Sequence, residues 1–226
     1  MNGLFYDALT ALAERRFLGA IRAALISPLR GSIVEVGAGT GASFSYYDAS
    51  THVLAMEPDP SMFKRAEQRA AQASADVDIM RVSDLALDDL SAQSADHVVA
   101  TLVLCSVEEP VSTLHRIHRV LRPGGTFVFV EHVRAGGLAG KIQSSLTPLW
   151  RRVAGNCHLD RTIEPTLQQA GFALSGLSEK VMPFPLRRLV YGSAMKSEVS
   201  SGAHSESVLR PRAPITLRND DTTPRS

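Results

Sequence analysis

The sequence predicts an α/β fold whose doubly wound sheet has seven strands, mostly parallel, with an antiparallel final hairpin. Apolar strand-like segments alternate with amphipathic helical segments over the first five strands, as in βαβ units covered on both faces of a sheet. The last two strand candidates have no helix between them, so they should pair as a hairpin at the sheet edge. With 226 residues, 44% of them hydrophobic, the chain can bury the core of one domain.

The elements are predicted in chain order from these patterns. The parallel strands are expected at residues 32–36, 52–56, 77–82, 96–104 and 126–130. Helices are expected from Pro60 to about residue 73 after an Asp59 N-cap, from Pro110 to the Arg122-Pro-Gly-Gly125 stop, near 138–153 and near 161–170. The closing hairpin is expected from residues 173–182 and 188–195.

The two ends of the chain differ from this central domain. Residues 4–26 carry apolar side chains at helical spacing, so we assign 1–30 to an amphipathic helix packed on a domain of residues 31–196. Residues 197–226 contain no aromatic side chain and many Ser, Thr, Pro and Arg residues. Such a segment buries too little apolar area to offset its ordering entropy, which predicts a disordered tail.

Composition and charge exclude several functional classes. A net charge of +1 gives no electrostatic reason to expect a nucleic-acid partner, and two cysteines exclude a disulfide-rich secreted scaffold. No apolar run approaches the roughly 20 residues of a spanning helix, and charged residues interrupt the N-terminus where a secretory signal would lie. We expect a cytoplasmic protein, with peripheral membrane contact left open and the oligomeric state not indicated.

The strongest local motif is the glycine-rich stretch Val34-Glu-Val-Gly-Ala-Gly-Thr-Gly41, which follows a strand. Glycines allow a tight turn and a close approach of the backbone to a ligand. Glu57 lies twenty positions after Gly37, at the end of the second strand, where a carboxylate can accept hydrogen bonds from both hydroxyls of a ribose. Taken alone, this pattern also fits a nicotinamide dinucleotide site.

Features farther along the chain separate the two interpretations. The third strand ends in Ser83-Asp84-Leu85, the fourth in Thr101-Leu-Val-Leu-Cys-Ser-Val107, and the fifth follows a Pro-Gly-Gly turn and ends in Val130-Glu-His-Val133. In this order and spacing, residues 30–195 resemble the class I S-adenosylmethionine-dependent methyltransferases, which have a Rossmann-like fold. The resemblance implies S-adenosyl-L-methionine as the cofactor.

A closer similarity is to the methyltransferase-like seven proteins, which are thiol S-methyltransferases, and to their small bacterial relatives. The shared segments are Thr101–Val107, Arg119-Val-Leu-Arg-Pro-Gly-Gly125, Glu131–Val133 and Cys157-His-Leu-Asp-Arg-Thr162. The animal proteins of this group carry an apolar N-terminal membrane anchor, whereas residues 4–26 here are amphipathic and charged.

The resemblance also implies a role for each residue of the cofactor site. The methionine end would be lined by Glu35, Gly37, Ala38 and Gly39. The ribose would be held at Glu57 and Pro58, and the adenine amino group and ring at Asp84 and the Leu85 amide. The end of the central strand beneath the sulfonium would be Thr101, Leu102 and Val103.

Two histidines are candidates for a general base on the acceptor side. His132 is expected just past the fifth strand, at the edge where open α/β sheets bind ligands, and His158 lies in the Cys157–Thr162 segment. The alternatives are a plain loop histidine and a surface histidine. No metal is predicted, because no ligand pair at a suitable spacing accompanies Cys157 and His158, and Cys105 is expected to be a packed loop cysteine.

These observations predict a methyltransferase of small molecules, with a thiol as the favoured acceptor. A phenol or carbon acid needs a strong base, whereas a thiol is partly ionised at neutral pH. The alternatives are an N- or C-methyltransferase of a lipid or quinone head group, a nicotinamide-dependent oxidoreductase, and a non-catalytic cofactor-binding module. The oxidoreductase would need a catalytic Tyr-Lys pair or a second substrate domain, and the sequence indicates neither.

Overall fold

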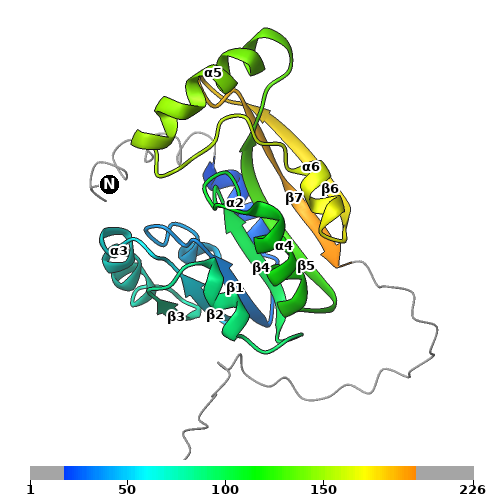
Figure 1. Cartoon of the computed structure of the whole chain (residues 1–226). Coiled ribbons are helices and arrows are strands. Elements are labelled where there is room, and N and C mark those ends of the chain that lie inside the picture. The colour runs from blue at the N-terminus through cyan, green and yellow to red at the C-terminus, as the bar shows by residue number, and fades with distance from the viewer. Residues whose placement is uncertain (1–17, 197–226) are drawn as a thin grey trace, which may run out of the picture.

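The computed structural model describes residues 18–196, which form a seven-stranded sheet with helices on both faces (Figure 1). The helices are α2 (Gly19–Ile26), α3 (Pro60–Ala70), α4 (Pro110–Val120), α5 (Gly137–Val153) and α6 (Glu164–Gln169). The strands are β1 (Ser32–Val36), β2 (His52–Met56), β3 (Asp76–Met80), β4 (Ala95–Thr101), β5 (Leu121–Val133), β6 (Phe172–Val181) and β7 (Arg188–Lys196). The predicted tail and the predicted helix before residue 18 lie outside the described residues.

The strand order β3-β2-β1-β4-β5-β7-β6 confirms the predicted fold class. The first five strands are parallel, and β7 runs antiparallel to both β5 and β6. The chain order reverses between the adjacent strands β1 and β4, so their carboxyl ends form the crevice in which open α/β sheets bind ligands. All five residues of β1 are buried, as expected for a central strand covered on both faces.

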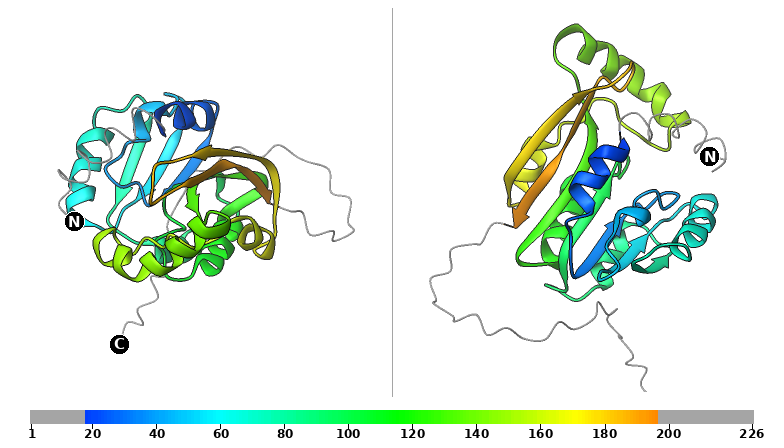
Figure 2. Two further views of the ribbon diagram at one scale, coloured as in Figure 1. Left: turned by 90° about the horizontal axis from the view of Figure 1, so that it is seen from above. Right: turned by 180° about the vertical axis from the view of Figure 1, so that it is seen from behind.

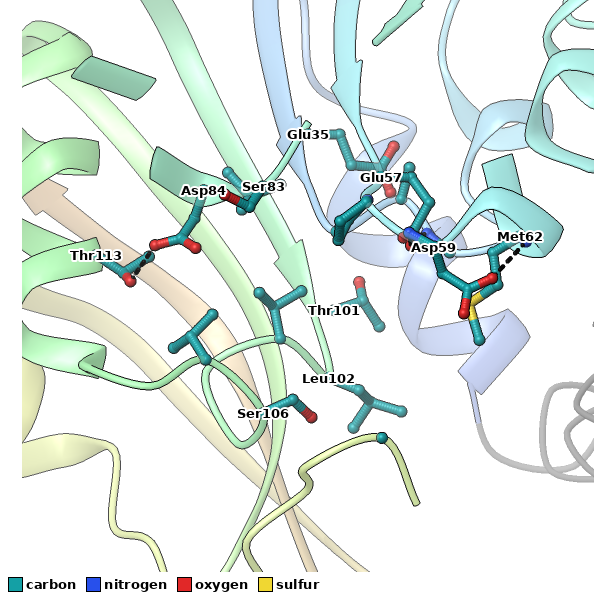
Figure 3. Close-up of a pocket in the computed structure, with 18 of the residues that line it drawn as sticks. Glu35, Glu57, Asp59, Met62, Ser83, Asp84, Thr101, Leu102, Ser106 and Thr113 are labelled. Atoms are coloured by element: carbon teal, nitrogen blue, oxygen red, sulfur yellow. Dashed lines mark hydrogen bonds between the residues drawn. The ribbon is translucent and has the colours of Figure 1, made fainter. Parts of the chain in front are cut away.

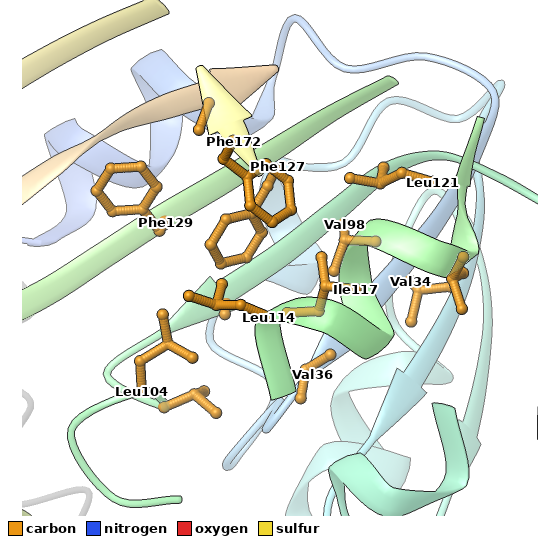
Figure 4. Close-up of a cluster of buried hydrophobic side chains, with 14 of the residues drawn as sticks. Val34, Val36, Val98, Leu104, Leu114, Ile117, Leu121, Phe127, Phe129 and Phe172 are labelled. Carbon is orange, nitrogen blue, oxygen red and sulfur yellow. The ribbon is translucent and has the colours of Figure 1, made fainter. Parts of the chain in front are cut away.

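Two apolar clusters hold the helices to the two faces of the sheet. On one face, Leu114 and Ile117 of α4 pack against Val98 of β4 and Phe127 of β5 (Figure 4). On the opposite face, a second cluster contains residues of α2 and α3 with alternate side chains of the same strands, such as Val99 and Val128. The view from behind shows α2 crossing the face opposite α4 (Figure 2). The two-residue alternation of the strands thus builds both cores at once.

The largest difference from the predicted elements is the length of β5, which was expected at 126–130 and spans Leu121–Val133. Its first residue pairs with Ala95, and the register then shifts, so that the Arg122–Gly125 turn forms an irregular part of the strand instead of a loop before it. At the other end, antiparallel pairing with β7 continues to Val133. This pairing extends the strand through Glu131 and His132, which corrects the expectation that His132 follows the strand.

Smaller differences follow from local backbone geometry. β4 ends at Thr101, earlier than expected, because Leu102 has a φ of +58° and cannot continue a strand. Helix α3 begins as expected, with Asp59 accepting hydrogen bonds from the amides of Ser61 and Met62. The last predicted helix is short, covering Glu164–Gln169. No helix between residues 18 and 196 is both long enough and apolar enough to cross a bilayer.

Candidate active site

A cavity of about 1030 Å³ opens at the carboxyl ends of β1, β2, β3 and β4 (Figure 3). The loops after these strands form most of its wall, and residues of α2, α3 and α4 and residues 154–156 form the rest. Every residue predicted from the resemblance to contact the cofactor lines this cavity. They are Glu35, Gly37, Ala38, Gly39, Glu57, Pro58, Asp84, Leu85, Thr101, Leu102 and Val103.

The glycine loop after β1 needs two of its glycines for different reasons. Gly37 has a φ of +64°, and a Cβ built there would lie 2.6 Å from Cγ2 of Val103. Gly39 has a φ of +60°, but a Cβ there would meet no protein atom within 4 Å. Gly37 therefore permits close packing of the loops after β1 and β4, whereas Gly39 leaves a stretch of backbone open to the cavity.

Glu57 joins the loops after β1 and β2. Its Oε2 accepts a hydrogen bond from the amide of Gly39, and its Oε1 accepts one from the amide of Asp59, both at 2.8 Å. Burial raises the pKa of the Glu57 carboxyl, and the two amide hydrogen bonds oppose this shift. Each carboxylate oxygen has a second lone pair, so the group can still accept hydrogen bonds from a diol in the cavity.

Glu35 lies beneath the glycine loop and is almost fully buried. It accepts a hydrogen bond from the Tyr47 hydroxyl at 2.9 Å, and the charge of Arg22 from α2 favours its ionised form. Burial outweighs these contacts and raises the pKa of the Glu35 carboxyl. Arg22 also lines the cavity, which the sequence interpretation missed because no motif marks it.

Asp84 stands at the far side of the cavity, on the loop after β3. Its Oδ2 accepts a hydrogen bond from the Thr113 hydroxyl of α4 at 2.6 Å and lies 3.6 Å from the Arg116 guanidinium. Figure 3 shows the Asp84 carboxylate beside Thr113, across the cavity from Glu57. These two contacts fix the orientation of the carboxylate at the cavity wall.

The loop after β4 is held from behind by two side chains. The buried Glu131 carboxylate accepts hydrogen bonds from the consecutive amides of Val103, Leu104 and Cys105, at 2.8, 2.7 and 3.2 Å. Burial raises the pKa of Glu131 to about 7, although these hydrogen bonds oppose the shift. Arg161 donates hydrogen bonds to the carbonyls of Leu104 and Val107, both at 2.6 Å. The sequence marked Glu131 only as part of a shared segment.

The cavity fits S-adenosylmethionine, the cofactor that the resemblance implies. Its volume is of the order of ~1,000 Å³, at the large end of small-molecule sites. Glu57 presents carboxylate oxygens suited to ribose hydroxyls, and Asp84 presents an acceptor suited to an amino group. The open backbone at Gly39 allows a ligand to approach without meeting a side chain.

The structure places neither predicted histidine at this cavity. His132 is buried, with its Nε2 2.7 Å from Sγ of Cys157, and the side chain of His158 has its Nδ1 3.1 Å from the carbonyl oxygen of Cys105. Both lie behind the loop after β4, because β5 carries His132 past the cavity and the chain turns back at Cys157. The acceptor-side role predicted for them has no support in this geometry.

Comparisons with known proteins agree with the fold. A methyltransferase-domain family model matches residues 34–129. Thiol S-methyltransferase TMT1B of Rattus norvegicus is 34% identical over 175 residues, covering 73% of this chain and 70% of that protein. Human thiol S-methyltransferase TMT1A is 35% identical over 180 residues, with the same shares covered.

Among solved structures, a putative methyltransferase from Bacillus halodurans C-125 has a similar fold, with a TM-score of 0.64 at 14% identity. The match covers 78% of this chain and 98% of that one. The sheet order, the cavity at the switch between β1 and β4, and the relatives together give the family. The chain belongs to the class I S-adenosylmethionine-dependent methyltransferases, within the family of the thiol S-methyltransferases.

Proposed function

We propose that this protein transfers the methyl group of S-adenosylmethionine to the sulfur of a small thiol. One observation carries the choice of acceptor: among residues 18–196, no His, Lys, Tyr or Cys lines the large cavity. The wall thus lacks histidine, the most common general base, and its titratable side chains are carboxylates and arginines. A thiol has a pKa of about 8.5 and supplies a few per cent of reactive thiolate at neutral pH without a base.

The relatives support the same acceptor. The curated proteins that match over most of this chain are named thiol S-methyltransferases and are 34% to 36% identical to it. A phosphatidylethanolamine N-methyltransferase of Cereibacter sphaeroides is 31% identical over 111 residues, but the match covers only 49% of this chain. The thiol is therefore the first acceptor to test, and a lipid amine is the second.

The chain's own residues would bind and orient both reactants. Glu57 would accept hydrogen bonds from the ribose hydroxyls, Asp84 one from the adenine amino group, and Arg22 would face the methionine carboxylate. When bound, S-adenosylmethionine supplies a methyl group on a positively charged sulfur, and its neutral thioether product needs no acid. The protein's task is then to align the acceptor sulfur and to exclude water.

The acceptor would approach along the wall formed by Leu102, Ser106 and residues 154–156. Figure 3 shows Leu102 and Ser106 on the side of the cavity away from Glu35 and Glu57. The Asn156 side-chain amide donates a hydrogen bond to the carbonyl of Ser106 at 2.7 Å, which ties the two loops of this wall together. This wall carries no charged side chain, so it suits an uncharged or apolar thiol.

An acceptor screen tests the proposal. The full chain is incubated with S-adenosylmethionine and alkyl thiols, sulfide, phenols, amines or phosphatidylethanolamine vesicles, and S-adenosylhomocysteine is measured by mass spectrometry. We expect product with alkyl thiols and none with phenols or amines. Turnover of an amine, phenol or lipid without any thiol turnover would refute the proposal. Calorimetric titration with NAD in parallel should show no binding, since the cavity is assigned to S-adenosylmethionine.

The pH dependence tests the absence of a base. With subsaturating thiol, the rate should rise with pH and level off at the pKa of the acceptor itself, moving with that pKa across a thiol series. His132→Ala should leave this profile unchanged, because His132 does not line the cavity. A profile that shifts upward in the variant would instead restore His132 as the base that activates the thiol.

We also propose that the protein works in the cytoplasm. Cys105 and Cys157 are both free thiols, and free thiols persist in reducing compartments.

A further inference from the structure

Three soft donor groups meet behind the loop after β4. Cys105 lies on that loop, His132 near the end of β5, and Cys157 between α5 and α6. Their donor atoms, Sγ of each cysteine and a ring nitrogen of the histidine, all lie within 4.8 Å of one another. All three residues are buried, with 3%, 3% and 8% of their surface exposed.

This cluster is separate from the cofactor cavity. None of its three residues lines that cavity, so cofactor binding and methyl transfer do not explain why they converge. A second cavity, of about 280 Å³, is lined by Cys105, His132 and Arg161. This cavity gives a small ion a route to the cluster and leaves room for a bound water.

The Cys157 sulfur already lies in contact with the histidine. Its Sγ lies 2.7 Å from Nε2 of His132 and accepts a hydrogen bond from the Trp150 indole N–H at 3.3 Å. Two cysteine sulfurs and an imidazole in one buried place form a donor set that zinc prefers.

The distance between His132 and Cys157 suits an ion after a small movement of the histidine, and the other donor distances are within 4.8 Å. With Zn–S and Zn–N bonds of about 2.3 and 2.0–2.1 Å, the nitrogen and sulfur ligands of a tetrahedral site lie about 3.5 Å apart. The His132 ring must therefore move by less than about 1 Å from its present 2.7 Å contact. Its Nδ1 has no hydrogen-bond partner among the described residues, so the movement breaks no such bond.

We propose that Cys105, His132 and Cys157 form a zinc site, with a water from the second cavity as the fourth ligand. Binding would displace the thiol protons of both cysteines into solvent. The ion would join the loop after β4 to the segment before α6, and both segments contribute to the acceptor wall of the large cavity, through Ser106 and Asn156. The ion would act by joining these two segments, because its donor atoms do not line the space where methyl transfer takes place.

Metal binding by the full chain tests this site without any assay of activity. The protein is stripped with a chelator under reducing conditions, then titrated with Zn²⁺ against a chromophoric chelator and, separately, with Co²⁺. We expect one ion per chain, a thiolate-to-cobalt charge-transfer band and a rise in melting temperature with Zn²⁺. Cys105→Ser, Cys157→Ser and His132→Ala should each weaken binding at least tenfold, whereas His115→Ala, on exposed α4 surface, should not.

The same preparations give the results that would overturn the proposal. Zinc affinity that is unchanged in all three ligand variants, each shown by circular dichroism to be folded, would place any bound ion elsewhere. Failure of the parent protein to bind either ion would refute the site. If the unreduced parent instead loses two titratable thiols and 2 Da of mass, the pair forms a disulfide, and the cluster is a redox pair and not a metal site.

Discussion

The Glu131 carboxylate accepts a hydrogen bond from the Val103 amide at 2.8 Å, and through this contact β5 shapes the loop that closes the cofactor cavity. The residue before Val103, Leu102, has a φ of +58°, a left-handed conformation that costs a non-glycine residue roughly 1–2 kcal/mol. The three amides that follow Leu102 all donate hydrogen bonds to the buried Glu131 carboxylate, and these bonds offset the cost.

The first prediction is that Glu131 makes stability depend on pH. Its pKa is about 7 in the folded protein and near 4.5 when unfolded, because burial disfavours the charged form. Between these values the unfolded chain loses the proton first, so the free energy of unfolding should fall as pH rises from about 4.5 to about 7. The loss should be about 3 kcal/mol, since each pKa unit is worth about 1.4 kcal/mol. Denaturant unfolding across this range measures it.

The control is Glu131→Gln, which cannot ionise. The unfolding free energy of the parent minus that of the variant should fall steadily as pH rises through the same range, because only the parent has a carboxyl group to titrate at this position. Parallel stability curves for the two proteins would show that the buried carboxyl does not titrate there. A nearby surface variant, Glu108→Gln, should leave the parent's pH dependence as it is.

The order and type of the elements could be predicted because each depends on local patterns. Asp59-Pro60 predicts the start of α3 by capping chemistry alone, and the strand periodicities predict the sheet. The length of β5 could not be predicted in this way. Residues 131–133 become strand because β7, more than fifty residues later, supplies their partners. The Arg122–Gly125 turn becomes part of the strand through its pairing with β4.

The lining of the large cavity was predictable because the strand ends carry it in sequence order. Gly37, Glu57 and Asp84 each follow a parallel strand, and such ends meet at one edge of the sheet. The back of the site was not predictable, because its contacts join segments far apart in the chain. Cys105 and Cys157 have no motif spacing, and their meeting with His132 depends on how the chain returns after α5.

The second prediction compares two glycines that share a backbone conformation. Gly37→Ala and Gly39→Ala both place a side chain at a φ near +60°, a strain of roughly 1–2 kcal/mol. Gly37→Ala adds a clash with Val103, so it should destabilise the fold by roughly 1–3 kcal/mol more than Gly39→Ala. Gly39→Ala should instead act mainly on cofactor affinity. Denaturant unfolding and calorimetry separate the two effects.

A second-site variant checks the origin of the clash. Val103→Ala removes the methyl groups that a Cβ at position 37 would meet, so it should recover part of the stability of Gly37→Ala. It should give no such recovery in Gly39→Ala. Equal destabilisation by the two glycine variants would contradict the close approach of the loops after β1 and β4.

The third prediction concerns Glu57. Glu57→Ala should weaken S-adenosylmethionine binding by about 1.5–3 kcal/mol, the worth of hydrogen bonds to a charged group. It also leaves the amides of Gly39 and Asp59 without their acceptor, so some stability should be lost. Glu57→Gln keeps one acceptor oxygen. Its cofactor affinity and its stability should therefore lie between those of the parent and those of Glu57→Ala. Glu67→Ala, on the exposed face of α3, is the matched control. Cofactor affinity unchanged in Glu57→Ala would remove this residue from the site.

The last prediction uses Thr113, whose hydroxyl donates a hydrogen bond to Asp84 at 2.6 Å. Thr113→Val removes this donor at nearly constant volume and leaves the Asp84 carboxylate held by Arg116 alone. The affinity for S-adenosylhomocysteine should fall by about fivefold, equivalent to about 1 kcal/mol for one hydrogen bond. Thr113→Ser keeps the hydroxyl and should bind almost as the parent does.

An analogue of S-adenosylhomocysteine without the exocyclic amino group shows whether this effect passes through Asp84. The parent should bind the analogue more weakly than S-adenosylhomocysteine, because the carboxylate then has no amino group to accept from. Thr113→Val should add little further loss with the analogue, since the contact that Thr113 orients is already missing. If the variant instead loses the same affinity for both ligands, Thr113 acts on the cavity by another route, and Asp84 does not recognise the amino group of the adenine.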